Sequence, residues 1–242
     1  MESTAYGDYL IQLTDHPIIF PINAYLVREE DGFTLVDTGL ASTGAKIVAA
    51  ARALGLPIAR IALTHAHGDH VGGLDVVHAA FPEAPVAISA RDARPLGGDM
   101  SRDPDEPQAK LRGQFVRRET QPTRLLRAGD RVGSLAVVAA PGHTPGQVAF
   151  LDTRDGTLIA GDAFQTRGGI AVAGVVRPLF PFIAMGTWQA QTALETARRL
   201  RALTPARLAV GHGPVLTDPV AAMDTAIAVA ERKVWREVAH AR

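Results

Sequence analysis

One short segment of the chain combines residue types and spacing that favour metal chemistry. Three of the eight histidines lie within six residues, in the segment HAHGDH at 65–70. Neutral imidazole and carboxylate are ligands for zinc and other divalent first-row metals. At this chain's His and Asp frequencies the pattern is expected by chance in about 6 × 10⁻⁴ of such sequences, which disfavours a His-rich surface turn. We interpret His65, His67, Asp69 and His70 as candidate metal ligands.

Three further candidate ligands resemble this segment in position, because each directly follows a short apolar run. The HAHGDH segment follows the run at 58–63; His143 follows 135–140 in PGHTPG, Asp162 follows 157–160 in AGDA, and His212 follows 207–210 in GHGP. We predict that these runs are β-strands. Strand ends at one edge of a sheet are where α/β proteins place their sites. Five histidines and two aspartates are enough ligands for two metal ions that share one of them.

Strands and helices are expected along the whole chain, which predicts a single α/β domain over residues 1–242. Further strands are predicted at 9–13, 22–27, 33–36, 86–89 and 148–151, and helices at 42–54, 74–81, 187–203 and 217–240. Two segments interrupt this pattern. Residues 97–123 are polar with several prolines, and residues 164–186 are apolar but rich in Gly and Pro. We expect both to be loops on the substrate side of the protein.

Composition excludes several classes of function. The 25 Lys and Arg residues balance 25 Asp and Glu residues, which argues against nucleic acid and anionic membranes as partners. The absence of cysteine excludes disulfides and thiolate metal sites. No secretory signal pattern and no apolar run of membrane-spanning length is present, so we expect a cytoplasmic protein. The expected partner is a small-molecule substrate; the oligomeric state, including a homodimer, stays open.

Taken together and in this order, HAHGDH, PGHTPG, AGDA and GHGP, with VDTG upstream at 36–39, resemble the metallo-β-lactamase superfamily. The resemblance implies an αββα four-layer sandwich, in which two mixed β-sheets are flanked by helices, with a dinuclear site at one edge. The implied ligands of the first metal are His65, His67 and His143, and those of the second are Asp69, His70 and His212. Asp162 would bridge the two ions, and Asp37 of VDTG would lie just behind the ligands. As an alternative, Asp37 is only a turn residue before the helix at 42–54.

Such a site predicts hydrolysis. Two divalent ions would lower the pKa of a shared water and give a hydroxide nucleophile. Zinc is the favoured metal, and iron and manganese are alternatives. The hydroxide would attack an ester, thioester or lactone carbonyl of a small substrate. Asp69 is the candidate proton shuttle. Three alternatives remain at this point: a persulfide dioxygenase with one iron, a phosphodiesterase of the same fold, and a non-catalytic metal-binding domain.

The sequence differs from several branches of the family, and these differences narrow the range of substrates. An aspartate at 162 and no export signal argue against antibiotic hydrolysis, and only 30 residues follow His212, which weakens a glutathione thioesterase. Gln165 stands where lactonases of this fold commonly carry a tyrosine. We include Gln165, Phe180 and Phe182 as candidate pocket residues, because segment 164–186 would place an apolar wall beside Asp162. Whether this segment is a lid, a pocket wall or an interface is left open.

Overall fold

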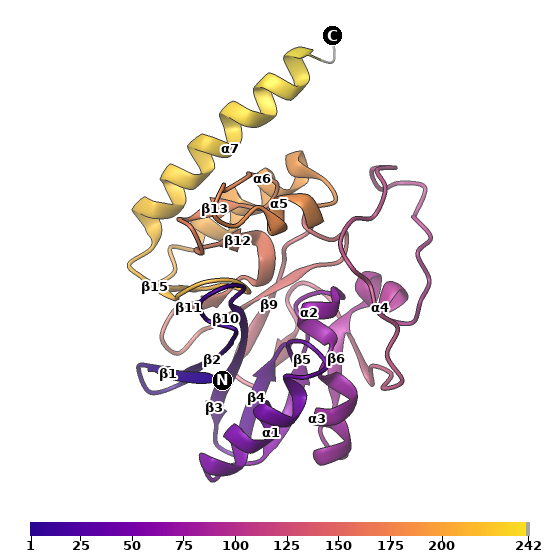
Figure 1. Ribbon diagram of the computed structural model, residues 1–242, viewed down its shortest axis with the longest axis vertical. Helices are drawn as coiled ribbons and strands as arrows, with labels where there is room; N and C mark the ends of the chain where they lie inside the picture. Colours follow the sequence, from indigo (N-terminus) through magenta and orange to yellow (C-terminus); the bar gives the residue numbers. More distant parts are fainter. Residues whose placement is uncertain (241–242) are drawn as a thin grey trace.

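A computed structural model gives the arrangement of the chain and describes residues 1–240, with side chains up to residue 235 (Figure 1). Residues 241 and 242 of the predicted domain lie outside the described residues. Two large mixed sheets pack face to face, and helices cover both outer faces. This is the four-layer αββα sandwich that the resemblance implies. Among the described residues, no helix is long and apolar enough to cross a membrane.

The first sheet contains seven strands whose spatial order follows the chain. It comprises β1 (Glu2–Tyr6), β2 (Leu10–Asp15), β3 (Ile22–Glu29), β4 (Gly32–Val36), β5 (Ile58–Ala62), β6 (Val86–Ser89) and β7 (Arg124–Leu126). The pairs from β1 to β4 are antiparallel, and those from β4 to β7 are parallel. Parallel strands require crossover connections, and the crossovers carry the helices α1 (Gly44–Ala53), α2 (Gly68–Val71), α3 (Leu74–Ala80) and α4 (Ala90–Leu96).

The second sheet has six strands in the order β15-β14-β11-β10-β9-β8. The strands are β8 (Arg131–Val132), β9 (Leu135–Ala139), β10 (Val148–Asp152), β11 (Thr157–Ile159), β14 (Arg207–Ala209) and β15 (Leu216–Thr217). Only β11 and β14 pair in parallel. The remaining elements are η1 (Gly161–Ala163), β12 (Phe164–Gln165), β13 (Ala171–Val172), α5 (Phe182–Gly186), α6 (Ala190–Ala202) and α7 (Val220–His240). In Figure 1, α7 lies across this half and its far end extends beyond the body.

Side chains that alternate between the two faces of each sheet build three apolar cores. One core lies between the sheets, and one lies between each sheet and its helices, which gives four layers. Successive strand side chains point to opposite faces of a sheet. In β3, Ala24 and Leu26 join the core beneath α1 and α3, whereas Tyr25 and Val27 join the core between the two sheets. In β10, Ala149 instead faces the core beneath α6 and α7. Every strand that is buried on both faces therefore needs apolar residues at each position, as the short apolar runs of the sequence indicate.

Several elements differ from the sequence prediction. The segment 187–203 contains α6 only from Ala190, and the separate helix α5 lies within the predicted loop 164–186. The short helix α4 was not predicted, and it includes Pro95 within its seven residues. Strands of two or three residues, such as β8 and β15, are too short to show the periodicity on which sequence prediction depends.

Candidate metal centre

The predicted ligands meet at one edge of the sandwich, where strands of both sheets end. The HAHGDH segment follows β5, His143 follows β9, Asp162 lies in η1 directly after β11, and His212 follows β14. The strands β9, β11 and β14 run in the same direction, because β9 and β11 are each antiparallel to β10 and β11 is parallel to β14. Their carboxyl ends therefore lie at a common edge, as expected for a site in an α/β fold.

Two of the five histidines are anchored by backbone carbonyls. His67 Nε2 lies 2.8 Å from the carbonyl oxygen of Arg112, and His212 Nδ1 lies 2.7 Å from that of Pro21. A carbonyl oxygen can only accept, so each of these nitrogens carries the hydrogen. In the neutral ring the opposite nitrogen then has a free lone pair. That nitrogen faces the centre in both cases: His67 Nδ1 lies 3.0 Å from His143 Nε2, and His212 Nε2 lies 3.3 Å from Asp69.

Two threonines fix the rings of His65 and His143 in the same way. His65 Nδ1 lies 3.0 Å from Thr64 Oγ1, whose own hydrogen is donated to Asp37. His143 Nδ1 lies 3.1 Å from Thr187 Oγ1, whose hydrogen is donated to the Ile183 carbonyl. Each hydroxyl has only one hydrogen and must therefore accept from the histidine. The Nε2 lone pairs of both histidines are left directed toward the centre.

Asp37 anchors the fifth histidine and joins it to the first. Its carboxylate lies 2.8 Å from His70 Nδ1 and also accepts bonds from the backbone and hydroxyl of Thr64. Asp37 has a positive φ of 60°, a conformation that costs energy for a residue with a side chain. Asp37 thus lies behind His70 and is hydrogen-bonded to its ring, which is the position that the resemblance implies, and its role toward a metal stays a prediction.

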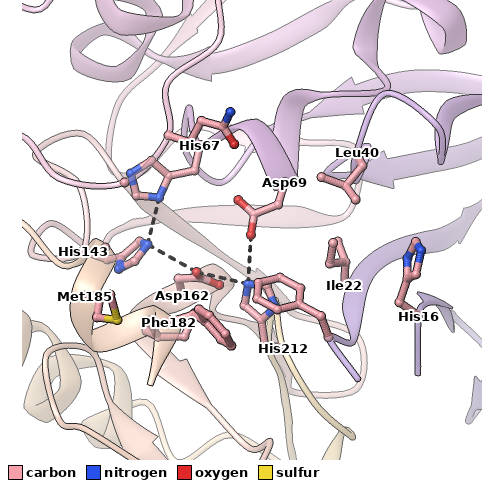
Figure 2. Close-up of a pocket in the computed structure, with 15 residues that line it drawn as sticks. His16, Ile22, Leu40, His67, Asp69, His143, Asp162, Phe182, Met185 and His212 are labelled. Atoms are coloured by element: carbon pink, nitrogen blue, oxygen red, sulfur yellow. Dashed lines mark hydrogen bonds and ion pairs between the residues drawn. The ribbon is translucent and has the colours of Figure 1, made fainter. Parts of the chain in front are cut away.

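The inward-facing atoms form three overlapping groups that fit metal ions. In each group all ligand atoms lie within 4.8 Å of one another, and the groups are His65–His67–His143, Asp69–His70–His212 and His65–His70–Asp162. Asp162 Oδ2 lies 3.2 Å from His143 Nε2 and 3.4 Å from His212 Nε2, so it lies between the two outer groups (Figure 2). His65 Nε2, His70 Nε2, His212 Nε2 and Asp162 Oδ1 are buried and make no hydrogen bond. Buried polar atoms require partners, and divalent ions would supply them.

The carboxylates divide the histidines into two electrostatic classes. Burial and the neighbouring histidines lower the pKa of His65, and burial lowers that of His143 to about 3 despite the opposing charge of Asp162. Burial also lowers the pKa of His212, but Asp162 and Asp69 outweigh it and raise the value to about 9. Asp162 is buried, which raises its pKa, yet the adjacent histidines hold the value well below the usual range. Without metal, the histidines at one end are thus neutral, whereas His212 at the other end is held in its protonated form by the carboxylates beside it.

A further aspartate, missed by the sequence analysis, holds the loops of two ligands together. Asp92 is fully buried at the start of α4 and accepts bonds from the Ala66 backbone at 3.0 Å, the Thr144 hydroxyl at 2.7 Å and the Gly146 backbone at 2.8 Å. Ala66 lies between His65 and His67, and Thr144 follows His143. The available signal was the spacing Ser89-x-x-Asp92, a helix-capping pattern, in which the Asp92 backbone does donate to Ser89.

A cavity of about 550 Å³ opens onto the centre. Its lining includes the sequence-predicted Phe182 together with His67, Asp69, His143, Asp162 and His212. The other two predicted pocket residues do not line it. Gln165 is buried and donates to the Phe180 carbonyl at 3.2 Å, and Phe180 is buried with its ring 5.3 Å from that of His212.

His16 and Phe20, which the sequence analysis did not identify as site residues, also line the cavity. The site is also shaped by backbone that passes close to the candidate ligands. A Cβ at Gly211 would lie 2.1 Å from Asp162 Oδ1, so only glycine fits there.

Comparison with known proteins agrees with this geometry. The family model of the metallo-beta-lactamase superfamily matches residues 18–212, and the chain belongs to this superfamily. It is 49% identical over 222 residues to the uncharacterized protein YobT of Bacillus subtilis (strain 168), covering 91% of this chain and 95% of that protein. It is 40% identical over 108 residues to a hydroxyacylglutathione hydrolase of Synechococcus sp., covering 43% of this chain and 33% of that protein. The crystal structure of TTHA1623 in a di-iron-bound form superposes with a TM-score of 0.65 at 30% identity, covering 87% of this chain and 96% of that one.

Proposed function

We propose that the protein is a hydrolase that cleaves an ester, thioester or lactone bond in a small substrate and uses two divalent metal ions, with zinc as the favoured metal. One observation carries the proposal. All five histidines commit one nitrogen to an outward partner and direct the other into the same centre, where two carboxylates meet them. The relationship to a hydroxyacylglutathione hydrolase supports hydrolysis as the reaction class.

When bound, the ions supply a water of lowered pKa and a Lewis acid for the substrate oxygen. The chain then has to move a proton, and Asp69 is the residue placed to do so. Its side chain is 25% exposed and lines the cavity, whereas that of Asp162 is 2% exposed. Burial raises the pKa of Asp69, but His70 and His212 outweigh this and lower it. Asp69 is therefore ionised at neutral pH and can accept a proton from the attacking water.

The decisive experiment is elemental analysis of protein purified without chelator, followed by assays on esters, thioesters and lactones. About two ions per chain and turnover of at least one of these classes are expected. A single iron with consumption of O₂ would replace the proposal by the persulfide dioxygenase. Absence of tightly bound metal after reconstitution would overturn the ligand assignment.

The role of Asp69 is tested by Asp69→Asn, which keeps the size of the side chain and an oxygen ligand but removes the base. We expect kcat to fall about 10²- to 10⁴-fold, measured at matched metal content. Asp105→Asn, on the exposed part of the loop after α4, is the matched control and should leave kcat unchanged. Wild-type kcat in a fully metal-loaded Asp69→Asn variant would assign the proton transfer elsewhere.

A further inference from the structure

The cavity above the metal centre has a continuous apolar wall built from two distant parts of the chain. Phe20, from the loop between β2 and β3, has its ring 4.9 Å from that of Phe182 in α5. Ile183 and Met185, also in α5, line the same cavity. In Figure 2 the side chains of Phe182 and Met185 lie beside His143 and Asp162. An apolar surface thus begins directly at the predicted metal ligands.

The apolar surface continues outward onto an exposed rim. In the loop that carries Phe20, Ile18 is 78% exposed and Ile19 is 84% exposed; in the segment around α5, Leu179 is 81% exposed and Met185 is 64% exposed. Folded proteins rarely leave several large apolar side chains exposed together unless the surface binds something. Phe20 packs against both Phe180 and Phe182, so the loop that carries Ile18 and Ile19 is joined to the segment that carries Leu179 and Met185.

Away from the candidate metal ligands, the described part of the cavity wall offers no basic side chain that would pair with a charge on the substrate. Among the described residues that line it, none is lysine or arginine. The two nearby arginines, Arg167 and Arg177, donate instead to the carbonyl oxygens of Ile18 and Ile170. His16 lines the mouth, but its Nδ1 lies 3.5 Å from the Asp15 carboxylate. A carboxylate that lay against this wall inside the cavity would therefore lose its hydration without gaining a partner, which is costly.

We propose that the substrate is an uncharged acyl ester, thioester or lactone whose linear apolar chain lies along Phe20, Phe182 and Met185 and leaves the cavity over the rim. This inference rests on the proposed hydrolase function. The reaction consumes one water: its oxygen forms the new bond to the acyl carbon, the bond to the leaving oxygen or sulfur breaks, and the leaving group takes up a proton. Thioesters of glutathione, which carry carboxylates, are disfavoured by the same surface.

The test is a set of p-nitrophenyl esters offered to the metal-loaded protein. Along the series from acetate to octanoate we expect kcat/KM to rise, by up to about fourfold for each CH₂ that becomes buried. The matched charged substrate is the mono-p-nitrophenyl ester of octanedioic acid, which has the same chain length with a terminal carboxylate. It should be at least about tenfold poorer than the octanoate, the equivalent of about 1.4 kcal/mol. A flat series, or equal turnover of the charged ester, would overturn the proposal.

Variants locate the chain-binding surface. Phe182→Ala should lower the octanoate-to-acetate ratio of kcat/KM about 5- to 20-fold, the equivalent of about 1.0–1.8 kcal/mol, and Met185→Ala should lower it in the same direction. Leu125→Ala is the matched control, because Leu125 is a 54% exposed apolar residue in β7 that does not line the cavity. An unchanged ratio in both α5 variants would show that the apolar wall does not bind the chain of the substrate.

Binding of the uncharged fluorophore N-phenyl-1-naphthylamine separates this inference from the hydrolase function. The fluorophore should bind to the wild type and to Leu125→Ala alike, and more weakly to Phe182→Ala, with or without metal. If the loaded protein hydrolyses no ester, thioester or lactone but shows this pattern, the hydrolase function fails and the apolar site stands. If esters are hydrolysed but binding of the fluorophore is insensitive to Phe182, the inference about the substrate fails alone.

Discussion

At the scale of single residues, the candidate ligands depend on particular residue types, whereas some of the groups that hold them from behind do not. The candidate ligands are His and Asp, residue types that commonly bind divalent metals, so their identities and spacing can be read from HAHGDH and the three later motifs. Their partners include the backbone carbonyls of Arg112 and Pro21, which any residue at those positions would supply. Such partners leave no signature in a sequence. The sequence therefore predicts which side chains could hold a metal, but of the groups that orient them it indicated only Asp37, through the resemblance.

Substitution of an anchoring threonine measures how much the orientation of a histidine ring contributes to metal affinity. Thr187→Val keeps the shape of the side chain but removes the oxygen that accepts from His143 Nδ1. Partners behind metal ligands typically contribute 10- to 100-fold in affinity, so we expect metal affinity to fall by about that factor. Competition with a chromophoric chelator measures it. Thr225→Val, which removes an exposed hydroxyl in α7, is the control, and equal affinities in the two variants would contradict the role of Thr187.

The raised pKa values of two histidines predict that metal uptake releases protons. Burial lowers the pKa of His70 and His212, but Asp162 and the other nearby carboxylates raise it, for His212 to about 9. Below that pH the imidazole is increasingly protonated and the metal must displace the proton, so affinity should weaken as pH falls. Calorimetric titration of chelator-treated protein at pH 7 in buffers of different ionisation enthalpy should report release of about two protons. A binding enthalpy that is independent of the buffer would contradict this assignment.

At the scale of elements, the loop after α4 shows where sequence analysis succeeded and where it stopped. Residues 97–123 were expected to be a loop on the substrate side, and Gly113 and Gln114 do line the cavity. The same loop also anchors a ligand, because the Arg112 carbonyl binds His67 and the Gln114 carbonyl accepts from the Gly68 backbone at 2.7 Å. Long-range contacts of this kind are set by tertiary packing. Strong local periodicity predicted α3 and α7 well, whereas it carried no information on the path of this loop.

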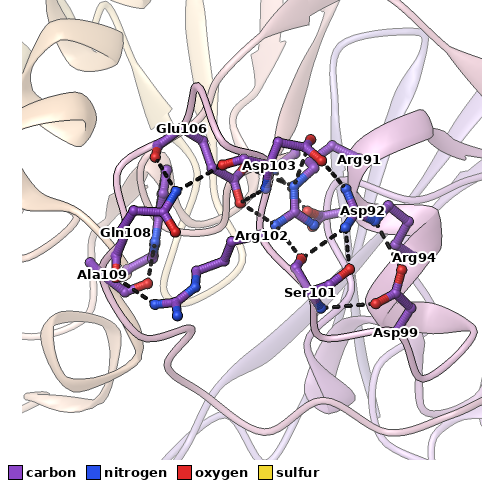
Figure 3. Close-up of polar contacts among 12 residues, drawn as sticks. Arg91, Asp92, Arg94, Asp99, Ser101, Arg102, Asp103, Glu106, Gln108 and Ala109 are labelled. Atoms are coloured by element: carbon purple, nitrogen blue, oxygen red, sulfur yellow. Dashed lines mark hydrogen bonds and ion pairs between the residues drawn. The ribbon is translucent and has the colours of Figure 1, made fainter.

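An ion-pair cluster on α4 holds this loop in place (Figure 3). Arg91 makes two bonds to Glu106, at 2.6 and 2.9 Å, and both side chains are largely buried. Arg94 binds Asp99 at 3.1 Å and Asp103 at 2.5 Å. Further along, Trp188 Nε1 donates to the Ala109 carbonyl at 3.1 Å. The loop is therefore tied down at several points between Asp99 and Ala109, just before Arg112.

Arg91→Gln should loosen the loop and, through Arg112, the ring of His67. We expect amide hydrogen exchange of residues 99–118 to accelerate about tenfold, the equivalent of about 1.4 kcal/mol of opening free energy, together with weaker metal binding. Hydrogen exchange detected by mass spectrometry measures the first effect. The control is Arg198→Gln, which removes an exposed pair with Glu231 on α6 and α7. Equal exchange of the loop in the two variants would show that the Arg91–Glu106 pair does not restrain it.

At the scale of the whole molecule, the candidate metal centre lies where the two halves of the sandwich meet. Each of the three ligand groups combines residues from the first sheet's half with one from the second: His65 and His67 with His143, Asp69 and His70 with His212, and His65 and His70 with Asp162. Direct bonds join the halves at the same edge. Tyr25 Oη donates to the Val210 carbonyl at 2.6 Å, and Asn23 Nδ2 donates to the carbonyls of Val210 and Gly213 at 2.8 and 2.7 Å.

Because the ligands converge only when both halves are folded and packed together, metal binding and folding must be linked. A ligand that binds only the folded state stabilises it by about 4.1 kcal/mol when present at 1,000 times its Kd. For a chain of this size, 1 kcal/mol corresponds to about 2–4 °C in Tm. We therefore expect chelation to lower Tm by roughly 8–16 °C for each ion held at that saturation. Thermal unfolding followed by circular dichroism, with and without chelator, measures the shift.

The control for this shift is Asp162→Ala, which removes the carboxylate that lies between the two outer ligand groups. Its Tm should respond much less to chelator than that of the wild type. A wild-type Tm that stays unchanged after complete metal removal would mean that the ligand edge is held together by protein contacts alone. In that case the bonds from Tyr25 and Asn23 to the loop of His212, rather than the ions, would join the two halves.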